Sequence, residues 1–249
     1  MSIPSNAVRL LDPTIPVDQS IYEESTSQKC RLGTRLVVGD QVFRYAKMGA
    51  SANVIPSVLL CTPSAVASHG GDILTISAQS AGATFLTCSA SVGNEFTANQ
   101  YAEGHVTVAS TGLGGGGLMF RIKSHASGAQ VPFYLYDNTP IAVSAGPGSL
   151  TPCLYKSVLQ GNAVTDVPVG VARIAVTTGN YFWLQTYGVA PVKASANLSI
   201  GIAVFNQVSG GAGANLTIAT LTAGGNAIGR AIGSGVDSRA VPVFLQIMP

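Results

Sequence analysis

The stretch "TGLGGGGLMFRIKSH", residues 111–125, decides between a fold with a dinucleotide-binding loop before a helix and an all-β fold. It contains the G-x-G-x-x-G spacing of a dinucleotide-binding loop, at Gly112, Gly114 and Gly117. Such a loop needs a helix directly after the glycines, because the N–H groups at the helix N-terminus hold the pyrophosphate. Residues 118–125 instead alternate between two faces, which is typical of a strand. Leu118 and Met119 also stand where a P-loop needs lysine and a hydroxyl residue. The stretch therefore predicts a glycine-rich turn before a strand and excludes a phosphate cradle.

The rest of the chain repeats this pattern of short strands and turns. "RLVVGDQVFRY" (35–45) predicts a hairpin with a type II′ turn at Gly39-Asp40. Further strands are expected at 72–79, 105–110, 118–125, 132–136, 170–177, 181–188, 198–205, 215–221 and 241–247, with a loop at 144–153. No segment has a clear helical period. The chain is therefore expected to be all-β, an antiparallel β-sandwich or barrel, in which residues 32–249 form one domain or two stacked modules divided near residues 146–151.

The composition is poor in charge and rich in glycine. Only 10% of the 249 residues are charged, and 29 are glycine, which suggests a surface covered by partners or by small polar side chains. The net charge of +2 and the scatter of Lys and Arg along the chain argue against nucleic acid. The N-terminus lacks the pattern of a secretory signal, and no apolar run of about 18 residues predicts a membrane span. The four cysteines are far apart and are expected to be buried free thiols, without a metal or cofactor.

Residues 1–31 differ from the remainder and predict an extended N-terminal arm. Three prolines forbid a continuous helix, while the segment is too apolar for a solvated tail. One interpretation is that the arm lies on a partner, and the other is that it folds back as an edge strand of its own domain. The candidate partner-interface residues are Ile3, Val8, Leu10, Leu11, Ile15, Val17, Ile21 and Tyr22.

The sequence does not assemble a catalytic site. Glu103 and His105 would share a face of a strand, but no third residue completes a catalytic or metal-binding set. No G-x-S-x-G, H-E-x-x-H or H-x-E motif occurs. Tyr181, Trp183 and Tyr187 would share one face of a strand, where they could stack on a sugar or anchor an interface, although packing in a β core is the interpretation that we favour. We expect no enzymatic activity.

Several ordered blocks between residues 32 and 249 resemble head decoration, or cement, proteins of tailed bacteriophages. The blocks are "LGTRLVVGDQVFRYAKMGAS" (32–51), "FTANQYAEGHVTV" (96–108), "GGGGLMFRIKSHASG" (114–128), "VPVGVARIAVTTGNYFWLQTYG" (167–188) and "AIGRAIGSG" (227–235). The first 31 residues take no part in the resemblance.

The resemblance implies a protein without catalytic residues that binds the outer surface of an assembled phage capsid. Its expected partners are the major capsid protein and two further copies of itself in a homotrimer, with neither nucleic acid nor membrane. Such a protein would be made in the host cytoplasm and would end on the virion, where it holds neighbouring capsomers together. The alternative is a virion-surface or tail-associated β protein that binds a receptor or glycan. An apolar arm would suit capsid decoration by a trimer. Once the arm of one copy has bound the capsid, the arms of the other two copies bind in an effectively intramolecular step, so each contact can be weak.

Overall fold

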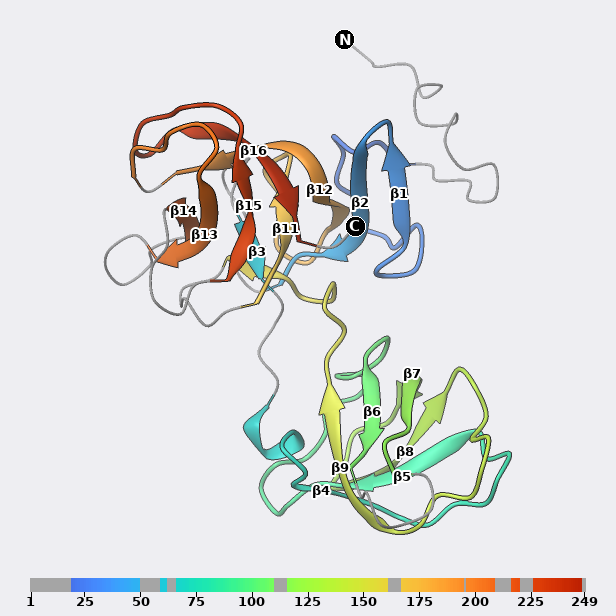
Figure 1. Ribbon diagram of the computed structural model, residues 1–249. Helices are drawn as coiled ribbons and strands as arrows, with labels where there is room; N and C mark the ends of the chain where they lie inside the picture. Colours follow the sequence, from blue (N-terminus) through green and yellow to red (C-terminus); the bar gives the residue numbers. More distant parts are fainter. Residues whose placement is uncertain are drawn as a thin grey trace. The chain divides into compact units, whose positions relative to one another are not determined.

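The computed structural model describes residues 19–49, 59–61, 66–109, 116–160, 167–194, 196–208, 216–219 and 226–247. Every strand-to-strand pairing in this part of the chain is antiparallel, apart from a parallel isolated bridge between Met48 and Val158. The only helical element described is a 3-10 turn, η2 (Ala67–His69). The all-β prediction is therefore confirmed (Figure 1).

The chain divides into two compact units. Unit 1 comprises residues 1–63 and 154–249, and unit 2 is the continuous segment 64–153 inserted between them. Each unit has its own cluster of buried apolar side chains. Unit 2 ends at Cys153, whereas residues 146–151, where the sequence places a division, form a strand.

Unit 1 is built on a curled ten-stranded sheet. Along the sheet the order is β10 (Leu159–Gln160), β3 (Leu59–Cys61), β11 (Pro168–Ala172), β12 (Tyr181–Lys193), β16 (Ala240–Gln246), β15 (Ala227–Ala231), β13 (Ala203–Val208) and β14 (Leu216–Ala219). The hairpin of β1 (Arg35–Val38) and β2 (Gln41–Lys47) joins this sheet at β12. The long strand β12 is central, because its first half pairs with β2 and its second half with β16.

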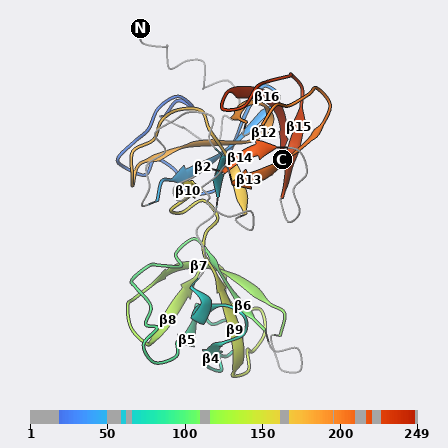
Figure 2. The same cartoon turned by 90° about the vertical axis from the view of Figure 1, so that its left-hand side faces the viewer.

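Unit 2 is a closed six-stranded barrel, seen in the lower half of Figure 2. Its strands follow one another around the barrel as β4 (Leu74–Ile76), β5 (Phe85–Ser89), β8 (Gln130–Leu135), β7 (Met119–His125), β6 (His105–Val108) and β9 (Gly146–Thr151). Alternate residues of β5, β6 and β8 are buried, as expected for strands that turn one face to a core. Closure leaves this sheet without an open edge.

Two sequence expectations about strands are wrong. Residues 144–153 were expected to be a loop, but β9 closes the barrel by pairing with both β4 and β6. A side chain at Gly148 would crowd the neighbouring strands, because a Cβ would lie 2.8 Å from Cγ1 of Ile76 and 2.9 Å from the backbone oxygen of Thr107. Residues 198–205 were expected to be one strand, but β13 begins only at Ala203, and residues 200–201 form a turn in which Ile200 is exposed.

Candidate functional site

Residues 19–25 of unit 1 lie against β2 and β12 and form a feature that we call the arm anchor. Gln19 is its centre, and its side chain uses both polar atoms. Its Nε2 donates to the carbonyl oxygens of Glu23 and Tyr181, each at 2.9 Å, and its Oε1 accepts from the hydroxyl of Tyr45 at 2.8 Å. The backbone oxygen of Gln19 accepts from Nε1 of Trp183 at 3.2 Å. Gln19 is therefore fixed to two strands of the sheet.

The far end of the arm anchor is held by Glu24 and Ser25. Ser25 makes an isolated antiparallel bridge with Tyr181, with hydrogen bonds of 2.9 and 2.8 Å in the two directions. The carboxylate of Glu24 accepts from the backbone N–H of Thr177 at 2.6 Å and from its hydroxyl at 2.8 Å. Burial raises the pKa of Glu24, but these hydrogen bonds outweigh it and leave the pKa below its ordinary value. Both ends of the segment are thus attached to unit 1.

The structure describes two of the eight candidate interface residues. Ile21 is 8% exposed and packs within unit 1. Tyr22 is 48% exposed, and the guanidinium of Arg173 lies 5.8 Å from the centre of its ring. The other six, which are Ile3, Val8, Leu10, Leu11, Ile15 and Val17, fall outside the described residues. Residues 19–31, which the sequence assigns to an arm, begin with an anchor to their own unit.

Trp183 of β12 belongs to the core of unit 1, whereas Tyr181 and Tyr187 on the same strand are partly buried. Trp183 and Tyr45 are fully buried and meet edge to face, with ring centroids 5.0 Å apart. Tyr181 stacks on Tyr45 at 6.0 Å. Burial raises the pKa of Tyr45 to about 12, which keeps its hydroxyl neutral as a donor to Gln19. The core interpretation of Trp183 is therefore correct, because its side chain is fully buried.

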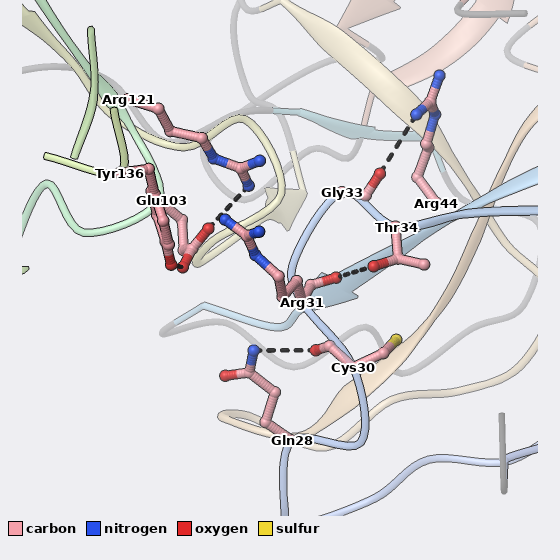
Figure 3. Close-up of polar contacts among 9 residues, drawn as sticks. All are labelled: Gln28, Cys30, Arg31, Gly33, Thr34, Arg44, Glu103, Arg121 and Tyr136. Atoms are coloured by element: carbon pink, nitrogen blue, oxygen red, sulfur yellow. Dashed lines mark hydrogen bonds and ion pairs between the residues drawn. The ribbon is translucent and has the colours of Figure 1, made fainter. Parts of the chain in front are cut away.

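Glu103 in unit 2 makes an ion pair with Arg121. Its carboxylate lies 2.7 Å from Nη2 of Arg121 and accepts a hydrogen bond from the hydroxyl of Tyr136, as Figure 3 shows. His105 lies opposite Arg121 in the β6–β7 register. Burial, and then the positive charge of Arg121, lower the pKa of His105. A neighbouring carboxylate would raise the pKa of a histidine, so the lowered pKa of His105 reflects burial and Arg121.

Two buried histidines form a polar network in unit 2 that the sequence did not predict. His69 on η2 lies 2.7 Å from the hydroxyl of Tyr101 through Nδ1 and 2.9 Å from the carbonyl oxygen of Asn94 through Nε2. Nε2 of His125 accepts from the backbone N–H of Tyr101 at 3.0 Å. The ring of His125 stacks on Phe133 with centroids 4.2 Å apart. These contacts hold the loop between β5 and β6 against the barrel, which is a structural role.

Burial governs the chemistry of the cysteines. No disulfide joins the described cysteines, and Cys61, Cys88 and Cys153 are buried, as the sequence predicted, whereas the prediction of burial is wrong for Cys30, which is partly exposed. Burial raises the pKa of Cys88 to about 12 and that of the half-exposed Cys30 to about 11.

We expect the folded protein at pH 8 to react very slowly with a chromogenic disulfide reagent. At a pKa of about 11, only about one Cys30 side chain in a thousand is the thiolate that reacts. After unfolding in guanidinium, all four cysteines should react within minutes. Rapid release of one equivalent from the native protein, lost in Cys30→Ser, would contradict this expectation.

The structure thus defines an all-β protein of two units. Its candidate functional site is the arm anchor of unit 1. Among the described residues, no group of three or more His, Cys, Asp or Glu side chains is placed to hold a metal ion, and no helix has the length and apolar character of a membrane span. No family model, curated protein or solved structure matches the chain.

Proposed function

We propose that this protein is a head decoration protein of a tailed bacteriophage, which binds the outer surface of the capsid and stabilises contacts between neighbouring capsomers. The observation that carries the proposal is the arm anchor, because it fixes the point at which residues 1–18 join the folded unit. Those residues include six of the eight candidate interface side chains. A segment tethered at a fixed point reaches a neighbouring site at high effective concentration, which is what a cement protein requires.

Three further features support this function over catalysis. Only 10% of the residues are charged, as suits a protein whose surface is covered in an assembly. The carboxylate of Glu103 pairs with Arg121, and burial lowers the pKa of His105. The sequence blocks that resemble decoration proteins include the β1–β2 hairpin and the first half of β12, which carry the arm anchor. The proposed partners remain the major capsid protein and further copies of the chain in a trimer.

Deleting residues 2–18 should abolish binding to phage heads while leaving both units folded. The deletion ends before Gln19, so the hydrogen bonds of the arm anchor stay intact. Occupancy on purified heads, measured by quantitative gel electrophoresis, should fall at least tenfold, and the heat stability of the heads should fall to that of undecorated heads.

A longer deletion of residues 2–25 serves as the comparison. It should also lower the melting temperature of the free protein, because it removes Gln19, which accepts hydrogen bonds from Trp183 and Tyr45. Unchanged occupancy after the 2–18 deletion would contradict the role of the arm. If the wild type also failed to bind heads, the proposed function itself would be wrong.

A further inference from the structure

All three histidines of the chain lie in unit 2, and two of them are buried against the same tyrosine. The exposed fractions of His69 and His125 are 1% and 3%. Nδ1 of His69 lies 2.7 Å from the hydroxyl of Tyr101, and Nε2 of His125 accepts from the backbone N–H of Tyr101 at 3.0 Å. Tyr101, in the loop between β5 and β6, is therefore held from two elements, η2 and β7. We call His69, Tyr101 and His125 the histidine clamp.

The hydrogen bonds of His125 assign it the neutral imidazole. Its Nδ1 lies 2.8 Å from the carbonyl oxygen of Ala126, which can only accept, so the ring proton is on Nδ1. Nε2 is then the unprotonated acceptor for the N–H of Tyr101. A second proton would have to bind at Nε2, where it would face that N–H and break the hydrogen bond. The ring also stacks on Phe133, and a charge buried there would lose its hydration.

His69 differs from His125 in the kind of group that it meets. Its Nε2 donates to the carbonyl oxygen of Asn94 at 2.9 Å, and this hydrogen bond is the same in the neutral and the charged ring. Its Nδ1 faces a hydroxyl, which can turn from donor to acceptor. A backbone N–H cannot turn in this way. Protonation therefore breaks the clamp at His125 and not at His69.

The other ionisable side chains on the elements around the clamp are neutral, exposed or paired with one another. Burial raises the pKa of Tyr101, so its phenol is neutral. Of the others, Glu95, Lys123 and Tyr134 are exposed, and Glu103 pairs with Arg121.

We propose that the histidine clamp is an acid-sensitive switch, which releases the loop between β5 and β6 when His125 takes up a proton. The inference does not depend on the proposed function. In the open chain the imidazole binds a proton with an ordinary pKa of about 6.5, whereas in the closed clamp Nε2 is occupied by the N–H of Tyr101. The open state therefore binds more protons than the closed state. By linkage, the stability of the clamp is complete above about pH 7 and falls as the pH drops below about 6.5.

Hydrogen exchange of the full-length protein at pH 7.5 and pH 5.0, corrected for the intrinsic exchange rates, tests the proposal. The amide of Tyr101, which donates to His125, and the amide of Ile122 on β7 should open about 30-fold more readily at pH 5.0. The amides of β12 are the internal reference, because unit 1 contains no histidine, and their opening should change much less.

His125→Gln should abolish the difference between the two pH values. Glutamine offers an amide oxygen to the N–H of Tyr101 and does not titrate. His69→Gln and His105→Gln are the matched controls and should keep most of the difference. Burial and Arg121 lower the pKa of His105, so His105→Gln should lose a small part of it.

Nitrogen NMR of the wild type gives a readout that does not require a variant to fold. Nε2 of His125 should be unprotonated in the native protein at pH 5.0. The proposal is overturned if unit 2 opens equally at both pH values, or if His125→Gln keeps the full difference. It is also overturned if native His125 is protonated at pH 5.0 while the amide of Tyr101 stays protected.

Discussion

Trp183→Ala should lower the free energy of unfolding of unit 1 by about 3–5 kcal/mol. Trp183 is fully buried, with Tyr45 against its ring and Gln19 at its indole nitrogen. The substitution leaves a cavity beneath the arm anchor and takes away the donor that holds the backbone oxygen of Gln19. Both losses act on the same segment, so the anchor should loosen as well as the core.

Chemical denaturation followed by circular dichroism would measure the loss, and limited trypsin digestion would report on the anchor. Lys29 donates its backbone N–H to the hydroxyl of Tyr45 at 3.1 Å, so cleavage after Lys29 should become faster when the anchor loosens. Trp183→Phe is the control, because it keeps an aromatic ring while it removes the indole N–H and part of the ring volume; it should cost about 1–3 kcal/mol. A Trp183→Ala variant as stable as the wild type, with unchanged digestion, would show that the anchor does not depend on Trp183.

Local patterns predicted those parts of the fold that neighbouring residues determine. The hairpin at 35–45 appears where the Gly39-Asp40 turn predicts it, with Gly39 at a φ of +62° and Asp40 outside the positive-φ region. The strand after the glycine-rich stretch is β7, and Gly117 before it has a φ of +80°. In both places the turn residue and the alternation of side chains are contiguous in the sequence, so no distant contact is needed to recognise them.

Tertiary contacts decided the parts that the sequence did not predict. The segment "GPGSLT" (146–151) has the composition of a loop, yet it is a strand because the closed barrel brings Gly148 close to Ile76 and Thr107. Residues 198–205 were expected to be one strand, but the turn at residues 200–201 leaves Ile200 68% exposed. Strand and turn propensities measure only local preference. For residues 146–151, the pairing that closes the barrel outweighs that preference.

The candidate site was predictable only in outline. The break in composition identified an unusual N-terminal segment, but nothing marks Gln19 as the residue that fixes it. Its partners, Tyr45, Tyr181 and Trp183, lie up to 164 positions away in the sequence. The apolar character of Ile21 fitted a partner interface and burial in its own unit equally well, and only packing separates the two interpretations.

Gly104→Ala should destabilise the barrel of unit 2 by about 3 kcal/mol or more. A Cβ on Gly104 would lie 2.3 Å from the backbone oxygen of Thr151 and 3.0 Å from the backbone nitrogen of Cys153. Both atoms belong to the main chain at the end of β9, so no side-chain rotation can relieve the clash. The β6–β9 pairing that closes the barrel would have to separate at this end.

Gly70→Ala is the matched control in the same unit, because a Cβ there meets nothing within 4 Å and its φ is not positive. It should change stability by less than about 0.5 kcal/mol. Since each unit has its own buried cluster, hydrogen exchange should show that Gly104→Ala accelerates the barrel amides, such as those of Val106 and Leu150, more than those of β12 and β16 in unit 1. If Gly104→Ala proved as stable as Gly70→Ala, β9 would be able to move away from residue 104 without a loss of stability, which would contradict the prediction. Equal acceleration in both units would mean that they unfold as one cooperative body, and then damage to the barrel would also release the arm anchor.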